Sequence, residues 1–345
     1  MKRPIVLNQS SFKDFQNCQR LYGWKRIQGL APVGRRGVLE IGTAVHLGLA
    51  VFHAGGINDA NDFLPQLDVD ADEEERAEYN IARARLEAVL KQTPLDQAVF
   101  AAAHKLTERA GPSSSFMDKS LEDALAIVTT ILPAYVKRWA PEGELWHPLN
   151  QEIECLVEVG DGTQNYLRLK SDNLSSAKGG LYLVDYKTMG KLDPRDMLKY
   201  EMDIQLTAYI YGLTKQLTSD ALSRGEEPVF IRGAIIDVLV KTQTPQFARE
   251  FFSRTLDELA EFEGEWNEVS DRIRAQHDRV YAGEDWKIVF PKSTEHCFHY
   301  GTCAFRDVCL KDTPVRRALY NTREPDYVDT AQEELTRIWR MEVVK

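Results

Sequence analysis

The sequence predicts an α/β fold in which helices flank a central mixed sheet. Residues 151–159 and 166–187 alternate polar and apolar side chains, which is typical of strands with one buried face. Residues 229–240 form an apolar run that suits a strand in the middle of a sheet. Segments of strong helix formers, among them 72–90 and 121–139, supply the flanking helices.

The composition is that of a globular protein, with 345 residues of which 43% are hydrophobic and 28% are charged. The sequence contains no apolar run of about 18 residues, and its polar start does not resemble a signal peptide. We therefore expect a cytoplasmic protein without a membrane partner. The formal net charge of −10 argues against a broad basic surface for nucleic acid, but not against a narrow groove lined by a few basic residues.

The N-terminal segment predicts two helices. The first begins at Ser10 or Ser11 and carries phenylalanines along one side, so that Cys18 faces inward or nearly so. The second spans about 38–53 and carries His46 among apolar neighbours. Without further context, a lone histidine in such a helix is more often a core residue than a metal ligand.

The segment 181–187 predicts a strand that holds Asp185 and Lys187 on one face, because side chains two residues apart on a strand project in the same direction. The turn-forming residues 175–180 predict an antiparallel hairpin that brings Asp172 to the same sheet edge. Two carboxylates suit Mg²⁺ or Mn²⁺, and the lysine can stabilise a phosphate or orient a water. A solvated surface hairpin is the alternative, and for an isolated acid-x-lysine pattern it is the more common one.

The helix expected after Asp193 carries Gln205 and Tyr209, which share one face because they are four residues apart. From the residues alone, this is a core helix with a partly buried tyrosine. Residues 251–281 predict a long amphipathic helix.

Five cysteines in a chain without a secretion signal favour metal binding over disulfides. Cys297, Cys303 and Cys309 follow one another at equal gaps, and a tetrahedral zinc ion or a four-iron cluster requires a fourth ligand. Cys18 is the candidate for a site of either kind. Zinc held by the trio with His299, or free thiols, are the alternatives.

These motifs resemble the RecB-like branch of the PD-(D/E)XK nucleases. The matching elements in chain order are the Gly42-x-x-x-His46 motif, Asp172, the Asp185-x-Lys187 pair and the Gln205-x-x-x-Tyr209 pair. The resemblance implies a restriction-endonuclease-like core. It further implies that one or two Mg²⁺ or Mn²⁺ ions are held by His46, Asp172, Asp185 and the backbone carbonyl of Tyr186, and that Asp172, Asp185, Lys187, Gln205 and Tyr209 form the catalytic site.

The cysteines extend the resemblance to iron–sulfur members of this branch, including CRISPR adaptation nucleases. In those proteins a cluster joins the two ends of the nuclease domain. The resemblance therefore implies a [4Fe–4S] cluster bound by Cys18, Cys297, Cys303 and Cys309, with structural Zn²⁺ as the alternative. Here both gaps in the trio are five residues, whereas a C-x₂-C pair is usual in the family.

The expected function is that of a metal-dependent DNA exonuclease acting on a single strand or a duplex end in recombination, repair or phage DNA processing. Two alternatives stay open. One is a catalytically idle iron–sulfur protein that binds nucleic acid or serves as a scaffold, and the other is a CRISPR adaptation nuclease working with an integrase. The sequence predicts no oligomeric state.

The predicted organisation has four parts. Residues 1–56 carry the first cysteine and the histidine helix, and residues 57–148 form a helical insertion without an apparent chemical role. Residues 149–311 form the nuclease core with the cysteine trio, and residues 312–345 form a tail.

Overall fold

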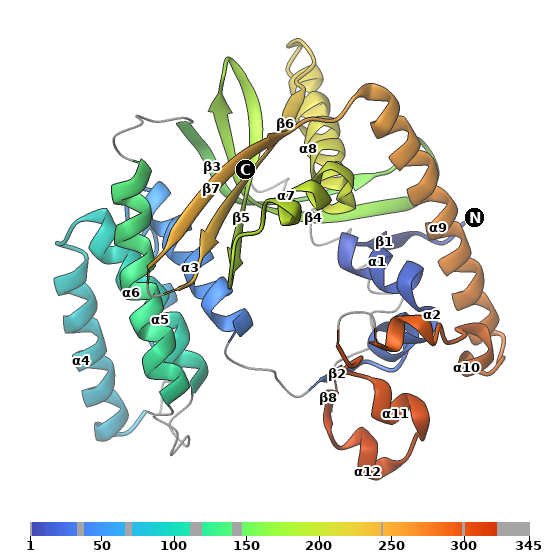
Figure 1. Cartoon of the computed structure of the whole chain (residues 1–345), viewed down its shortest axis with the longest axis horizontal. Helices are drawn as coiled ribbons and strands as arrows, with labels where there is room; N and C mark the ends of the chain where they lie inside the picture. The colour runs from blue at the N-terminus through green and yellow to red at the C-terminus, as the bar shows by residue number, and fades with distance from the viewer. Residues whose placement is uncertain are drawn as a thin grey trace.

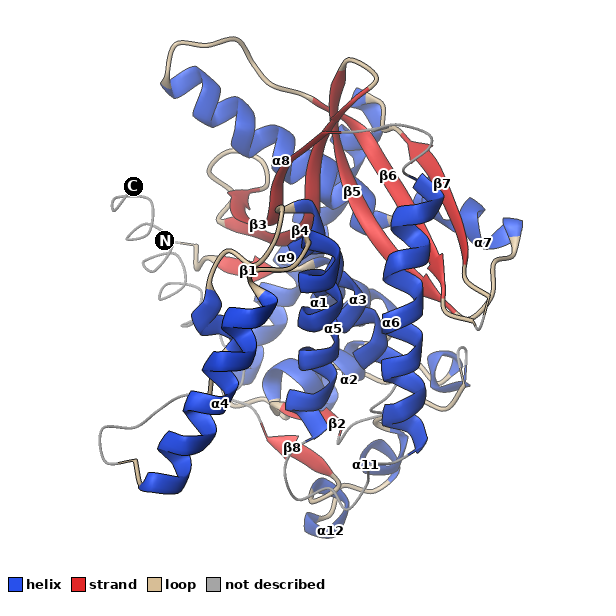
Figure 2. Ribbon diagram, turned by 90° about the vertical axis from the view of Figure 1, so that its left-hand side faces the viewer, coloured by secondary structure: helices blue, strands red, loops and turns tan. Residues whose placement is uncertain are grey.

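A six-stranded mixed sheet lies at the centre of the computed structural model (Figures 1 and 2). The structure describes residues 2–32, 38–65, 71–110, 119–139, 147–242, 244–298 and 301–322. The strand order is β1 (Ile5–Leu7), β4 (Asn165–Ala177), β5 (Gly180–Met189), β6 (Ile231–Val240) and β7 (Gln246–Phe252), with β3 (His147–Glu158) also paired to β4. The pairs β1–β4 and β5–β6 are parallel and the others are antiparallel, so the predicted mixed sheet is confirmed.

Helices cover both faces of the sheet. One face packs against α1 (Gln9–Asn17), α8 (Ile204–Ser223) and α9 (Leu256–Tyr281). The other packs against α3 (Val38–His53), α5 (Pro94–Ala110) and α6 (Lys119–Trp139), with α4 (Glu73–Val89) outside them against α5. Figure 2 shows α3, α5 and α6 together in front of the sheet. The helices of the 57–148 region thus complete the main core, whereas the division of the chain at residues 57 and 148 stays a prediction.

A small lobe follows the N-terminal helix and is completed by the C-terminal segment. Its two strands, β2 (Leu30–Pro32) and β8 (Tyr320–Thr322), pair antiparallel, and Figure 1 places them beside α11 (Arg306–Leu310) and α12 (Pro314–Arg317). Its core includes Trp24, Phe305 and Val308. The remaining short elements are α2 (Gln19–Tyr22), Gly23–Ile27, Ala60–Phe63, α7 (Pro194–Leu198), Lys199–Met202, α10 (Trp286–Val289) and Glu295–Phe298.

Three predicted boundaries were wrong, and in each case the structure shows what sets the actual boundary. Helix α1 begins at Gln9, since the Asn8 side chain accepts the Ser11 N–H and caps the helix. The hairpin turn is the Lys178–Gly179 pair, both residues with positive φ, while 175–177 continue β4. Residues 251–252 belong to β7, and the capping box of Thr255 starts α9 at the next residue.

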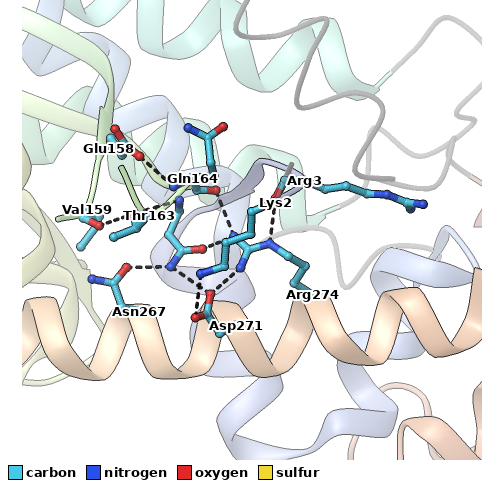
Figure 3. Close-up of polar contacts among 10 residues, drawn as sticks. Lys2, Arg3, Glu158, Val159, Thr163, Gln164, Asn267, Asp271 and Arg274 are labelled. Atoms are coloured by element: carbon cyan, nitrogen blue, oxygen red, sulfur yellow. Dashed lines mark hydrogen bonds and ion pairs between the residues drawn. The ribbon is translucent and has the colours of Figure 1, made fainter. Parts of the chain in front are cut away.

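Arg274 of α9 fastens the N-terminus to the β3–β4 turn (Figure 3). Its guanidinium donates to the carbonyl of Arg3 at 2.7 Å and to the carbonyl of Gln164 at 3.1 Å, and it also contacts the side chains of Asn165 and Asp271. These bonds hold β1 in place beside β4, the strand that carries Asp172.

The predicted tail lies mostly outside the described residues, which end at residue 322. Among the helices that are described, none is long and apolar enough to cross a membrane.

Candidate active site

The β4–β5 hairpin brings the predicted acid pair and lysine together. Lys187 Nζ lies 2.6 Å from Asp185 Oδ2, and the backbone N–H of Tyr186 donates to Asp172 Oδ2 at 2.9 Å. Asp185 is 2% exposed, because it lies in a strand with sheet partners on both sides. The predicted juxtaposition of Asp172, Asp185 and Lys187 is therefore present, and their catalytic roles remain predictions.

Helix α3 adds His46 to this group. The Nδ1 atom of His46 lies 3.4 Å from Asp172 Oδ2. One turn earlier, a Cβ atom on Gly42 would lie 3.0 Å from Thr188 Oγ1, so the glycine allows α3 to approach β5 closely. The Gly42-x-x-x-His46 spacing thus serves one purpose, which is to bring the histidine against the acid pair.

Burial acts to raise the pKa values of both aspartates, but their different neighbours move the two values in opposite directions. Burial, with the negative charge of Asp172, raises the pKa of Asp185 to about 6 even though Lys187 opposes the shift. Burial also acts to raise the pKa of Asp172, but the hydrogen bond and charge of His46 and the N–H of Tyr186 outweigh it, so that pKa is lowered. One site therefore contains two carboxylates with different affinities for a proton.

Helix α8 orients Asp185 from the opposite side. The Nε2 atom of Gln205 donates to Asp185 Oδ1 and to the hydroxyl of Tyr209, both at 3.2 Å. Burial raises the pKa of Tyr209, which keeps its hydroxyl protonated. The N-cap Asp203, whose side chain accepts the Gln205 N–H at 2.6 Å, fixes where the helix begins.

Gln9 of α1 extends this chain of hydrogen bonds and was not predicted from the sequence. Its Nε2 atom donates to the Tyr209 hydroxyl at 3.2 Å. An unbroken series of side chains thus runs from Gln9 through Tyr209 and Gln205 to Asp185. Gln9 carries no local signal for this role, because the contact spans 200 positions of the chain.

A cleft of about 750 Å³ opens in front of these residues. Its described lining consists of Gly42, Thr43, His46, Leu47, Lys105, Lys170, Asp172, Tyr186, Lys187, Thr188 and Lys241. Lys105 comes from α5, so the 57–148 region contributes a side chain to the cleft, whereas the prediction that this region has no chemical role is not tested. Lys170 and Lys241 also line the cleft and were not predicted from the sequence.

The four predicted cysteine ligands meet at a second, small pocket. Cys18, Cys297, Cys303 and Cys309 all line it, although Cys18 is separated from the others by most of the chain. The Ser293 N–H donates to Cys18 Sγ at 3.4 Å, and the Cys303 N–H donates to the carbonyl of Cys297 at 2.8 Å. Burial raises the pKa of Cys303, and the neighbouring thiols add to this shift.

Among the described residues, neither the cysteines nor the acid pair with His46 form a ready metal site, and metal binding by both groups stays a prediction. Across the part of the chain that is described, no three His, Cys, Asp or Glu side chains already have the arrangement of a formed metal site. His299, the ligand in one zinc alternative, lies outside the described residues. Cys155 does not line the pocket, and burial raises the pKa of its thiol to about 12.

The fold and the site together identify the class of protein to which this chain belongs. A mixed sheet between two helical layers, with an acid pair and a lysine on adjacent strands, is the restriction-endonuclease-like arrangement. The model of the PD-(D/E)XK nuclease superfamily matches residues 6–310, and the chain belongs to that superfamily. Its members are nucleases, which hydrolyse phosphodiester bonds. The predicted family is thereby confirmed.

Solved structures resemble the chain at low identity. A crystal structure from Eubacterium rectale, described as that of a candidate exonuclease, is 14% identical with a TM-score of 0.42, and the match covers 89% of this chain and 88% of that chain. The crystal structure of the protein SSO0001 is 14% identical with a TM-score of 0.28, covering 56% of this chain and 78% of that chain. No curated protein sequence matches.

Proposed function

We propose that this protein is a metal-dependent DNA exonuclease. The observation that carries the proposal is that Asp172 and Lys187 line an open cleft, with the buried Asp185 paired to Lys187, in a chain of a nuclease superfamily. A divalent Mg²⁺ or Mn²⁺ ion, when bound, supplies a Lewis acid and lowers the pKa of bound water. Both effects promote hydrolysis of a phosphodiester bond at neutral pH.

The donor atoms fit such an ion. Asp172 and Asp185, with the backbone carbonyl of Tyr186, supply the oxygen donors that Mg²⁺ and Mn²⁺ prefer, and His46 supplies a nitrogen. Asp185 Oδ2 is buried, and the ammonium group of Lys187 lies 2.6 Å from it. A buried carboxylate oxygen in this state is stabilised by cations, and Lys187 provides one of them.

Residues of the chain then have distinct tasks. Lys187, about a quarter exposed at the cleft, stabilises the negative charge that develops on the phosphate or orients the attacking water. Gln205 and Tyr209 hold the Asp185 carboxylate in one orientation, and His46 does the same for Asp172. The site is thus held rigidly before the substrate binds, which is the arrangement that efficient catalysis requires.

The exonuclease assignment is tested with linear and circular DNA of the same sequence. In Mg²⁺ or Mn²⁺, we expect end-labelled linear DNA to be shortened progressively, while covalently closed circles persist. Linear single strands and duplexes compared side by side identify the preferred end. Cleavage of the circles at the rate of the linear DNA would show an endonuclease instead, and binding without cleavage of either would show an idle protein.

We also propose that the four cysteines bind a [4Fe–4S] cluster that joins the N-terminal helices to the C-terminal segment. Cys18 caps α1, and the other three ligands lie between Cys297 and Cys309. We expect protein purified without oxygen to be brown, with a broad band near about 400 nm and about four irons per chain. Cys303→Ser should remove the colour, whereas Cys155→Ser should keep it. One zinc per colourless chain would support the zinc alternative, and absence of both metals would indicate free thiols.

Gln205→Leu is expected to lower kcat by about tenfold while KM changes by less than about twofold. The reason is that Asp185 loses a hydrogen bond to a charged group, which is worth about 1.5 kcal/mol, and tenfold in rate corresponds to about 1.4 kcal/mol. Steady-state kinetics on a short labelled DNA measure both constants. Gln216→Leu removes a hydrogen bond to Asp220 on the same helix away from the cleft, and it should leave kcat unchanged. Equal kcat values for the two variants would contradict an orienting role for Gln205.

A further inference from the structure

Lysines gather at the cleft of a protein that is acidic as a whole. The chain carries 43 Lys and Arg against 53 Asp and Glu, for a formal net charge of −10. Among the described residues that line the cleft, by contrast, four are lysines and one is an aspartate. Positive charge is therefore concentrated at the one place where a polyanionic substrate has to approach two carboxylates.

Three of these lysines lie outside the acid pair and its own lysine. Lys170 precedes Asp172 by two residues on β4, so both side chains project from the same face of the strand. The Lys241 N–H donates to the carbonyl of Met189 at 2.8 Å, which places Lys241 at the same end of the sheet as Lys187. Lys105 reaches the cleft from α5, a helix that packs on α3 next to His46.

The surroundings of these lysines suit anion binding. Burial lowers the pKa of Lys241, because its ammonium group is partly removed from water, and a phosphate beside it would favour the charged form again. Lys170 has an exposed ion pair with Glu154 at 3.7 Å, which is long enough to exchange for a phosphate contact at little cost. The three side chains come from a strand, a strand end and a helix, so together they flank the acid pair on more than one side.

We propose that Lys105, Lys170 and Lys241 bind DNA phosphates on either side of the bond that is cut. This inference rests on the proposed nuclease function and adds the residues that hold the strand in the cleft. The contacts are electrostatic and independent of base sequence, because lysine approaches a phosphate as a point charge. They position the strand so that one phosphodiester lies at Asp172 and Asp185.

The test is the salt dependence of DNA binding. A fluorescent single strand and a duplex are titrated with full-length protein carrying Asp185→Asn, which prevents cleavage, at several salt concentrations. Each lysine–phosphate contact contributes about 0.7 to the slope of log K against log salt on single strands and about 0.9 on a duplex. Log K falls as log salt rises, so the slope is negative. The triple change Lys105→Gln, Lys170→Gln and Lys241→Gln should therefore make the slope less steep by about 2 on a single strand.

A matched control separates local contacts from overall charge. Lys91→Gln, Lys178→Gln and Lys215→Gln together remove the same three charges at positions that do not line the cleft. This variant should keep the original slope, and a triple lysine-to-arginine change at the cleft should keep it as well. The melting temperatures of all three variants show whether each is folded.

The outcomes of this test are distinguishable from those of the nuclease assay. Equal slopes for the cleft variant and the control variant would overturn the inference, whether or not the wild-type protein cleaves DNA. Absence of salt-dependent DNA binding by the parent Asp185→Asn protein would overturn it too. Wild-type protein that binds through these lysines but never hydrolyses DNA would instead refute the proposed function and leave the binding site standing.

Discussion

Asp185→Ala is expected to lower the rate of DNA hydrolysis by at least about 10²–10³-fold. Removing a single preorganised electrostatic group from an active site has an effect of this size, and Asp185 is both a proposed ligand of the metal and the ion-pair partner of Lys187. Rates are measured with saturating metal on an end-labelled DNA. Asp185 carries no strand pairing through its side chain, so the sheet should form without it.

Two controls accompany this variant. Asp193→Ala removes a partly exposed N-cap carboxylate that pairs with the exposed Arg195 and does not line the cleft, and this variant should retain wild-type hydrolysis. Circular dichroism should show the same helix and strand content for both variants. Wild-type hydrolysis by a folded Asp185→Ala protein would remove Asp185 from the catalytic site.

Arg249→Met is expected to destabilise the protein by about 3–5 kcal/mol at pH 8, because breaking a buried ion pair leaves an uncompensated charge. Arg249 Nε lies 3.0 Å from Asp237 Oδ2, and the Asp237 side chain is fully buried. The Tyr135 hydroxyl donates to the same oxygen at 2.6 Å, and this hydrogen bond would remain in the variant. Urea unfolding at fixed temperature measures the loss.

The size of this loss should depend on pH. Burial raises the pKa of Asp237 to about 6, above its ordinary value of 3.8, although Arg249 opposes the shift. A raised pKa in the folded state means that protonation favours folding, so the contribution of Asp237 is greatest below about 3.8 and is lost as the pH rises through about 6. Without Arg249 the carboxylate should protonate more readily. The loss of unfolding free energy caused by Arg249→Met should therefore be clearly smaller at pH 5.5 than at pH 8.

Two further variants make this prediction specific. Arg249→Met combined with Asp237→Asn should recover most of the stability at pH 8, because the charge without a partner is gone. Arg83→Met breaks an exposed ion pair with Glu87 on α4 and should cost less than about 0.5 kcal/mol at either pH. A loss for Arg249→Met that is the same at pH 5.5 and pH 8 would contradict the assigned role of Asp237.

The central hairpin could be predicted from the sequence because its signal is local. Alternation with a period of two places Asp185 and Lys187 on one face without any knowledge of the rest of the chain. The turn was predicted too early because serines also occur often in turns. In the structure Ser175 is instead buried in β4, where its hydroxyl donates to Asn173 Oδ1 at 2.8 Å.

A contact between distant segments could be predicted where a metal site needs more ligands than one segment supplies. The trio at Cys297 to Cys309 lacked a fourth ligand, and this alone pointed to Cys18, which lines the same pocket. No such demand pointed to Gln9, Lys105 or Lys241, because a single glutamine or lysine is ordinary at a surface. Their places near the site follow from how α1, α5 and β6 pack, which no local pattern encodes.

The buried group around Asp237 marks another limit of local patterns. Within the apolar run of β6, Asp237 reads as an isolated polar residue, and its partners Tyr135 and Arg249 come from α6 and β7. The strand was predicted correctly because nine of its ten residues are buried, and the aspartate is buried with them through its partners. The apolar pattern thus predicted strand β6, whereas the burial of Asp237 is explained by its partners on α6 and β7.

The most direct test of the nuclease assignment is the metal requirement of DNA hydrolysis. Purified protein is treated with EDTA, dialysed, and incubated with end-labelled DNA while Mn²⁺ or Mg²⁺ is added in steps. We expect no hydrolysis without added metal and a saturable rate when it is restored, with no such recovery in Asp185→Ala. Hydrolysis that continues at full rate in EDTA, or none at any metal concentration, would contradict a metal-dependent nuclease built on Asp172, Asp185 and Lys187.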